Sequence, residues 1–164
     1  MKERKIVALI DEYQPDELPA RYSDLVDAAK AATTRAYAPY SKFHVGAAIR
    51  LANGEIVCGA NQENAAFSVT CCAERSACFY ASSQYPGVAF KQIAIAAYAE
   101  PEGGLKGELP PFQKMPISPC GICRQALLEY ETLHGPIEVI LYGDDAVYVL
   151  PSIKSLLPLS FTEF

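Results

Sequence analysis

Apolar and polar residues follow one another along the chain in two recurring patterns, one helical and one extended. Leucine and alanine recur at helical spacing in the segment 22–37, which predicts an amphipathic helix that ends before Pro39. Two apolar stretches, 44–52 and 55–60, flank Asn53-Gly54, the strongest short-range signal for a β-hairpin. The first third of the chain therefore predicts one helix followed by two antiparallel strands.

The remainder of the chain predicts two further helices and three further strands. The stretch 91–99 is almost continuously apolar, as expected of a central strand buried on both faces. The last two strands are separated only by Asp144-Asp145, which is too short for a parallel crossover, so they should be antiparallel. The predicted elements are helices 22–37, 72–85 and 123–134 and strands 44–52, 55–60, 91–99, 137–143 and 146–150.

The order of these elements predicts an α/β fold, with helices packed on both faces of one sheet. We expect a single domain over residues 1–164. The polar, proline-bearing residues 1–20 form an arm or a short strand in this interpretation. The loop 101–119, rich in proline and glycine, is the only candidate boundary, and neither side of it has enough elements for a core of its own.

Composition narrows the classes of function. Hydrophobic residues make up 51% and charged residues 20% of the 164 residues, which is typical of a globular protein. The net charge is −5 and the chain has no run of lysine or arginine, so neither a nucleic acid nor an anionic membrane surface is an expected partner. The apolar stretch Ile6–Ile10 is too short for a signal peptide or a membrane span, which predicts a cytoplasmic protein.

Thiols stay reduced in the cytoplasm, so the six cysteines indicate packing, a metal or catalysis rather than disulfides. In "CCAERSA" and "SPCGICRQ" a cysteine lies where a loop leads into a predicted helix, and helix N-termini stabilise thiolates. Cys120 and Cys123 are three residues apart and can hold one ion, for which Cys72 supplies a third ligand. Three protein ligands are typical of a catalytic zinc ion, which keeps a position for water.

Glu74 lies two residues after Cys72 and can act on that water, because zinc lowers the pKa of bound water to about 7. Arg75 can donate to a sulfur and offset the negative charge of three thiolates. Cys71 is one residue out of phase with Glu74 and is predicted to be a bystander. Taken alone, the Cys-x-x-Cys spacing also fits a redox pair, half of a zinc ribbon or two buried thiols. Together, Cys-x-Glu and Pro-Cys-x-x-Cys match the signature of zinc deaminases, with cysteine at the first ligand position.

The motifs "YSKFHVGAA", "NQENAA", "CAERSA", "PCGICRQ" and "LLPLSF" occur in this order, and residues 22–161 resemble the homotetrameric, short-chain cytidine deaminases. The resemblance implies a three-layer α/β/α fold with a mixed five-stranded sheet and one zinc ion per subunit. It also implies hydrolysis of cytidine and 2′-deoxycytidine to uridine and 2′-deoxyuridine in pyrimidine salvage, in a homotetramer whose active sites are completed by neighbouring subunits.

The resemblance further implies roles for individual residues. Without it, Asn61 would be interpreted as a turn residue, Glu63 as a solvated acid and Phe43 as a core residue. It implies zinc ligands at Cys72, Cys120 and Cys123, a proton shuttle at Glu74, ribose 3′-hydroxyl contacts at Asn61 and Glu63, base contacts at Phe43 and the Ala73 backbone, and a C-terminal aromatic near an active site at Phe161.

The chain departs from the family at several positions. His44 replaces a frequent proline and brings a ring nitrogen near the site, and Phe67 replaces a common tyrosine, which removes a hydroxyl contact. The stretch 101–117 is longer than the usual connection and is interpreted as a solvated insertion, with an oligomer contact or a site rim as alternatives. Gln125 is expected to cap or line its helix without a catalytic role.

Two other functions compete with cytidine deamination. One is a zinc deaminase that acts on another free aminopyrimidine nucleoside, a nucleotide or an antibiotic. The other is a non-catalytic module that zinc only stabilises. A polynucleotide deaminase fits less well, because it needs a basic groove and because such proteins often join their last two strands through a helix rather than a two-residue turn.

Overall fold

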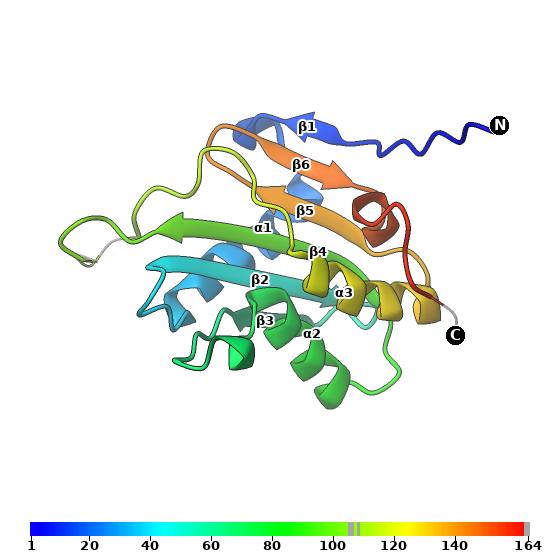
Figure 1. The fold of residues 1–164 in the computed structure, drawn as a ribbon. Coiled ribbons are helices and arrows are strands. Elements are labelled where there is room, and N and C mark those ends of the chain that lie inside the picture. The colour runs from blue at the N-terminus through cyan, green and yellow to red at the C-terminus, as the bar shows by residue number, and fades with distance from the viewer. Residues whose placement is uncertain (105–106, 108, 163–164) are drawn as a thin grey trace.

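The computed structural model describes residues 1–104, 107 and 109–162. Its strands form one six-stranded sheet in the order β1-β6-β5-β4-β2-β3 (Figure 1), in which only β4 and β5 are parallel neighbours. The strands are β1 (Asp11–Tyr13), β2 (Phe43–Leu51), β3 (Ile56–Ala60), β4 (Phe90–Ala99), β5 (Glu138–Tyr142) and β6 (Val147–Leu150). The α-helices are α1 (Ser23–Ala32), α2 (Ala73–Gln84) and α3 (Gly121–His134). Short 3-10 helices cover Pro15–Glu17, Ala20–Tyr22, Thr33–Arg35, Phe67–Val69 and Ile153–Leu156.

The sheet matches the predicted strands and adds one. The two final strands pair antiparallel, as the two-residue turn between them requires. The five-stranded sheet that the resemblance implied is corrected to six strands, because Asp11–Tyr13 pairs with Val147–Val149 at the open edge of β6. The alternative of a short strand in residues 1–20 is therefore the one that the fold adopts.

The first helix is shorter than its apolar pattern predicted. The α-helical part ends at Ala32, and the chain continues as a 3-10 turn. The hydroxyl of Thr33 donates to the Lys30 carbonyl (2.6 Å) and that of Thr34 donates to the Ala31 carbonyl (2.8 Å). Such bonds offer the backbone an alternative to the helical pattern and tighten the last turn. Within the described ranges, no helix combines the length and hydropathy needed to cross a membrane.

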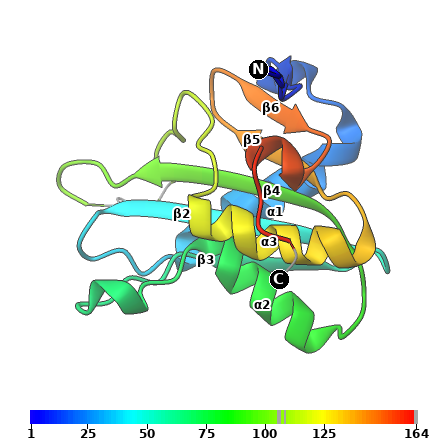
Figure 2. The same cartoon turned by 45° about the vertical axis from the view of Figure 1, so that its right-hand side comes forward.

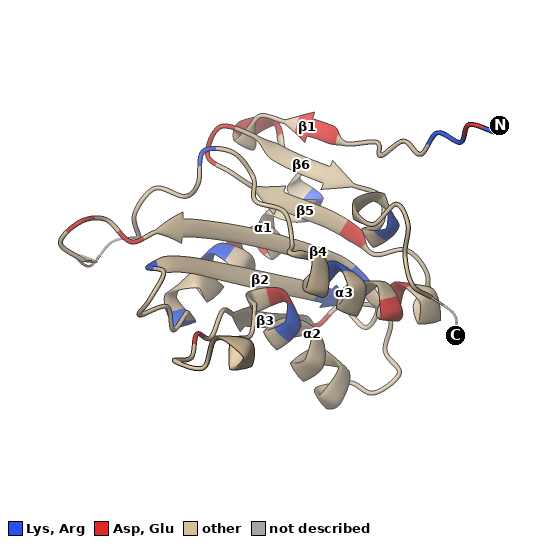
Figure 3. Cartoon of the chain, in the orientation of Figure 1, with Lys and Arg blue, Asp and Glu red and all other residues tan. Residues whose placement is uncertain are grey.

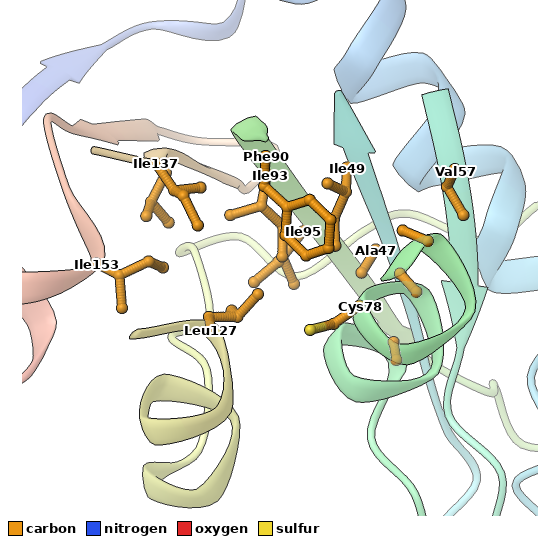
Figure 4. Close-up of a cluster of buried hydrophobic side chains, with 14 of the residues drawn as sticks. Ala47, Ile49, Val57, Cys78, Phe90, Ile93, Ile95, Leu127, Ile137 and Ile153 are labelled. Carbon is orange, nitrogen blue, oxygen red and sulfur yellow. The ribbon is translucent and has the colours of Figure 1, made fainter. Parts of the chain in front are cut away.

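The helices form two outer layers around the sheet. Helix α1 covers one face, and α2 and α3 lie side by side on the other (Figures 1 and 2). On the second face a cluster of buried side chains fills the space between the sheet and α2 and α3; Figure 4 shows Phe90, Ile95 and Leu127 among its members. A second cluster, which includes Tyr22 and Leu25, lies under α1. The predicted three-layer α/β/α architecture is confirmed.

The predicted insertion loop is not wholly solvated. The Phe112 ring meets Tyr98 and Tyr142 edge-on at 6.0 and 5.7 Å, and the Gln113 N–H donates to the Ala97 carbonyl (2.8 Å). The end of the loop, at Ile117, reaches the pocket described below. The solvated-insertion interpretation is corrected here because aromatic packing anchors this part. Residues 105, 106 and 108 of the loop 101–117, and residues 163–164 of the predicted domain, lie outside the described residues.

The C-terminal segment is fastened to α3 by a buried carboxylate. Glu131, 6% exposed, accepts hydrogen bonds from the backbone N–H groups of Ile137 (2.9 Å) and Ile153 (2.8 Å) through Oε2. Its Oε1 accepts from the Ser152 hydroxyl (2.5 Å) and the Lys154 N–H (3.2 Å). Four donors thus compensate one buried charge, and three of them, at Ser152, Ile153 and Lys154, belong to the start of the 3-10 helix Ile153–Leu156.

We predict that Glu131→Gln destabilises the protein by about 1–3 kcal/mol, because the new amide group faces N–H donors that it cannot bond. Chemical denaturation, followed by circular dichroism, measures the loss. Glu129→Gln is the matched control on the exposed side of the same helix. Equal stability of the two variants would contradict the role given to the Glu131 carboxylate.

Candidate active site

Three thiols converge where two helices begin. Cys72 and Cys120 are the residues that immediately precede α2 and α3, and Cys123 lies in the first turn of α3. The Cys72 and Cys120 sulfurs are 3.8 Å apart, those of Cys120 and Cys123 are 3.5 Å apart, and all three lie within 4.8 Å of one another. No side-chain hydrogen bond caps α2 or α3 among the described residues, so the first N–H groups of both helices are not used by a capping side chain beside these cysteines.

The donor set fits a zinc ion. Ligands about 2.3 Å from a tetrahedral zinc ion are about 3.8 Å apart, close to the measured sulfur separations. The group contains three ligands among the described residues, which leaves one tetrahedral position for a non-protein ligand. Cys71 is not part of it: the Cys71 sulfur accepts from the Ser76 hydroxyl (3.6 Å).

Electrostatics favour a thiolate at Cys72. Hydrogen bonding with Cys123, followed by the guanidinium of Arg75, lowers the pKa of the Cys72 thiol to about 5. The Cys72 thiolate in turn raises the pKa of Cys123, and burial adds to this effect. Arg75 also donates to the Thr70 carbonyl (3.2 Å), which holds it beside the sulfurs. A divalent cation bound by the three sulfurs would favour the thiolate form of each, because a metal-binding cysteine is deprotonated.

Glu74 lies in the first turn of α2 and is 4% exposed. Burial raises the pKa of its carboxyl group, and the neighbouring Cys72 thiolate adds to the shift. The side chain nevertheless lines a pocket that also contains Cys72 and Cys120. A nearly buried acid with access to a cavity at a metal site can exchange a proton with a bound molecule.

The pocket has a volume of about 280 Å³. The structure brings four of the predicted site residues to it besides the cysteines: Phe43, Asn61, Glu63 and Glu74. The sequence prediction missed the remaining lining residues. Val45 shares the face of Phe43 at strand period two, and Ile117-Ser118 lie just before the Pro-Cys motif, so both signals were present in the sequence. The other lining residues are Ser41, Val45, Thr70, Ile117 and Ser118.

Asn61 and Glu63 hold the pocket wall together. The Asn61 amide donates to the Phe43 carbonyl (2.9 Å) and accepts from the Val45 N–H (2.8 Å). Glu63 Oε2 accepts from the N–H groups of Tyr40 (2.9 Å) and Ser41 (3.3 Å). The Ser41 hydroxyl and these N–H groups lower the pKa of Glu63, so the pocket carries a carboxylate charge at its rim.

Two predicted residues are not among those that line this pocket. Ala73 is fully buried at the start of α2, and Phe161, 65% exposed, is not among the residues that line this pocket. Phe161 is held instead beside α3, where its carbonyl accepts from the Gln125 amide (2.8 Å). Gln125 thus lines its helix, as expected, and fastens the C-terminal segment.

The two residues that depart from the family pattern, His44 and Phe67, lie at different positions relative to the pocket. His44 points to the opposite face of the sheet, where it stacks on Tyr98 with the ring centroids 4.8 Å apart and meets Glu100 (3.3 Å). His44 therefore does not line the pocket and is not part of the three-thiol group, because strand alternation sends neighbouring side chains to opposite faces. Phe67 is 88% exposed and lines an adjoining pocket of about 450 Å³ that shares Ser41, Glu63 and Thr70 with the first.

Arg124 is a further residue that sequence reasoning missed. Its guanidinium donates to the Pro119 carbonyl (2.7 Å), the Ser118 hydroxyl (2.8 Å) and the Leu156 carbonyl (2.8 Å). It thereby ties the loop that carries Cys120 to the C-terminal segment. Only the adjacency of Arg124 to Cys123 could have signalled this, because its partners are set by tertiary packing.

Comparisons with known proteins agree with this geometry. Residues 19–135 match the family model described as the cytidine and deoxycytidylate deaminase zinc-binding region. A cytidine deaminase of Sporosarcina psychrophila is 40% identical over 140 residues, which cover 85% of this chain and 90% of that protein. The chain therefore belongs to the family of zinc-dependent cytidine and deoxycytidylate deaminases, and its cofactor is zinc.

Solved structures show the same fold. The crystal structure of cytidine deaminase from Burkholderia pseudomallei has a TM-score of 0.66 and 41% identity, covering 84% of this chain and 97% of that one. The crystal structure of cytidine deaminase from Mycobacterium tuberculosis has a TM-score of 0.66 and 28% identity. The match covers 88% of this chain and 100% of the Mycobacterium tuberculosis chain.

We predict that Cys72→Ser lowers zinc affinity by at least about tenfold, whereas Cys71→Ser leaves it unchanged, because only the Cys72 sulfur belongs to the three-thiol group. Competition with a coloured zinc chelator measures both affinities. The neighbouring cysteine serves as the matched control. Loss of zinc from the Cys71 variant, with retention in the Cys72 variant, would contradict the ligand set.

Proposed function

We propose that the protein catalyses the hydrolytic deamination of cytidine and 2′-deoxycytidine to uridine and 2′-deoxyuridine, with release of ammonia, in pyrimidine salvage. The observation that carries the proposal is the buried Glu74 carboxylate, which shares a pocket with the three-thiol group. A site that only stabilises the fold has no need for an acid with access to a cavity. This argues against the non-catalytic module.

The residues divide the chemistry among them. Cys72, Cys120 and Cys123 hold one zinc ion per subunit, which when bound activates water for attack on C4 of the pyrimidine. Glu74 takes one proton of that water and gives it to N3 of the base. It then takes the second proton from the hydroxyl group now on C4 and gives it to the departing amino group, so that ammonia leaves and a carbonyl remains at C4. Arg75 offsets the charge of the thiolates.

The remaining pocket residues bind the nucleoside. Phe43 packs on the pyrimidine ring and the Ala73 backbone helps to hold the base. Asn61 and Glu63 contact the ribose 3′-hydroxyl. One Asn61 N–H already binds the Phe43 carbonyl, so the second N–H of that amide is the donor available to the sugar.

The charge of the rim favours a nucleoside over a nucleotide. Glu63 is held as a carboxylate by Tyr40 and Ser41, and its negative charge repels a 5′-phosphate that comes close. Deoxycytidylate remains the second candidate substrate, because the matched family description includes deaminases of that nucleotide.

We also propose a cytoplasmic homotetramer of single-domain subunits, whose active sites are completed by neighbouring chains. Tyr40, Phe67 and Val69 are 63%, 88% and 64% exposed beside the pocket, an apolar surface of the kind that a partner covers. Phe161 is the residue that the partner contributes in this proposal. The cytoplasm keeps the zinc-binding thiols reduced.

We predict that Glu74→Gln lowers the turnover of cytidine by roughly 10²–10⁴-fold, because the amide cannot carry the proton. Zinc content and thermal stability should stay unchanged. An ultraviolet assay of cytidine, together with metal analysis, measures both properties. Glu55→Gln, an exposed position outside the pocket, serves as the matched control.

A panel of cytidine, 2′-deoxycytidine, CMP, dCMP and cytosine, assayed with the same enzyme, tests the substrate. The two nucleosides should be turned over fastest. Normal turnover by the Glu74 variant would refute the mechanism. Activity on CMP without activity on cytidine would overturn the substrate assignment and leave the mechanism intact.

A further inference from the structure

The N-terminal segment projects from the edge of the sheet and exposes apolar side chains. Residues 6–10 are all apolar, and Ile6, Val7, Leu9 and Ile10 are 59%, 75%, 71% and 49% exposed. Figure 1 shows this segment leading into β1, with the N-terminus projecting beyond the sheet; near β1, Leu9 lines a shallow pocket with Val149 and Pro151. It precedes residue 19, where the match to the deaminase family begins, so the family's shared machinery gives no reason for it.

The chain's own sheet cannot pair with this segment. β1 pairs with β6 up to Asp11, which lies opposite Val149. Continuing the same register would place Leu9 opposite Pro151, which has no N–H to donate. β1 therefore ends at Asp11, and its outer side is the edge of the sheet among the described residues.

Edge strands are normally protected against pairing by charges, prolines or bulges. Residues 6–10 contain no charge and no proline. Charges occur instead at the two ends of the apolar stretch. Arg4 and Lys5 precede it, and Asp11 and Glu12 follow it; in Figure 3 the ribbon has basic residues near the N-terminus and acidic residues on β1.

This pattern is antisymmetric about Ala8: two basic residues, five apolar residues and two acidic residues. We propose that residues 4–12, here named the arm, pair as an antiparallel strand with the arm of a second copy of this chain. The twofold axis passes through Ala8, so that the two edge strands join into one continuous sheet.

In this register, residues of opposite charge lie opposite each other at both ends of the paired arms. Lys5 lies opposite Asp11 of the second copy and Arg4 opposite Glu12, and the twofold axis repeats both pairs. Ile6 faces Ile10 on one side of the joined sheet, and Val7 faces Leu9 on the other. A register shifted by two residues would leave charges opposite apolar residues, so the sequence specifies one alignment.

The charge pairs allow a test of contact between copies, because the paired residues cannot contact each other within a single chain. Lys5 and Asp11 are six residues apart, about 20 Å in an extended strand, and cannot meet within one arm. Any coupling between these two positions therefore reports a contact between copies.

The experiment measures self-association by sedimentation at low salt for wild type, Lys5→Glu, Asp11→Lys and the double variant. Each single change turns two attractions into two repulsions, and we expect it to raise the dissociation constant of the arm-mediated step roughly tenfold. The double variant restores opposite charges and should return to within about twofold of wild type. Lys2→Glu, the matched control beyond the charged ends of the paired stretch, should leave association unchanged.

Deletion of residues 1–10 should abolish the same association step. The proposal is overturned if this deletion, or either single variant, associates like wild type. It is also overturned if the double variant is as weak as the two single changes combined. Cytidine turnover should be equal in all arm variants, because no arm residue lines the pocket. Failure of arm pairing is therefore distinguishable from failure of the proposed enzyme activity.

Discussion

The convergence of three cysteine sulfurs within 4.8 Å is the constraint on which the rest of the site depends. Three thiolates at this separation repel one another. Apolar side chains supply no positive charge to compensate this repulsion. The fold places the starts of α2 and α3 side by side on one face of the sheet (Figure 2), so that Cys72 and Cys120 lie at the positive ends of two helix dipoles. Arg75 adds a full positive charge, and the bound zinc ion supplies the rest of the positive charge that the thiolates need.

The same constraint explains why distant segments are tied to these helices. Arg124 fastens the loop before Cys120 to Leu156, and Glu131 fastens the end of α3 to the turn that begins at Ile153. On the opposite wall, Asn61 joins β3 to the start of β2. Metal ligands must be held within fractions of an ångström, and short hydrogen bonds between otherwise mobile loops provide that precision.

Much of this arrangement was predictable, because the relevant signals are local. The sequence pattern predicted the three α-helices and the strands β2 to β6, and the spacing of Cys72, Glu74 and the Cys-x-x-Cys motif predicted the group at the metal. For β1 the sequence left an arm and a short strand open, because three residues carry no measurable period. Arg124 escaped prediction because its acceptors, two backbone carbonyls and the Ser118 hydroxyl, lie up to 32 residues away. The place of His44 follows from its alternation with Phe43, which assigns it to the other face of β2.

The coordination of the bound metal is the most direct test of this account. X-ray absorption spectroscopy at the zinc edge, on protein purified with its native metal, counts sulfur and lighter ligands separately. The account predicts three sulfurs at about 2.3 Å and one oxygen ligand. Four sulfurs, which would bring Cys71 or another thiol to the metal and close the site, would contradict it, as would a metal bound without sulfur.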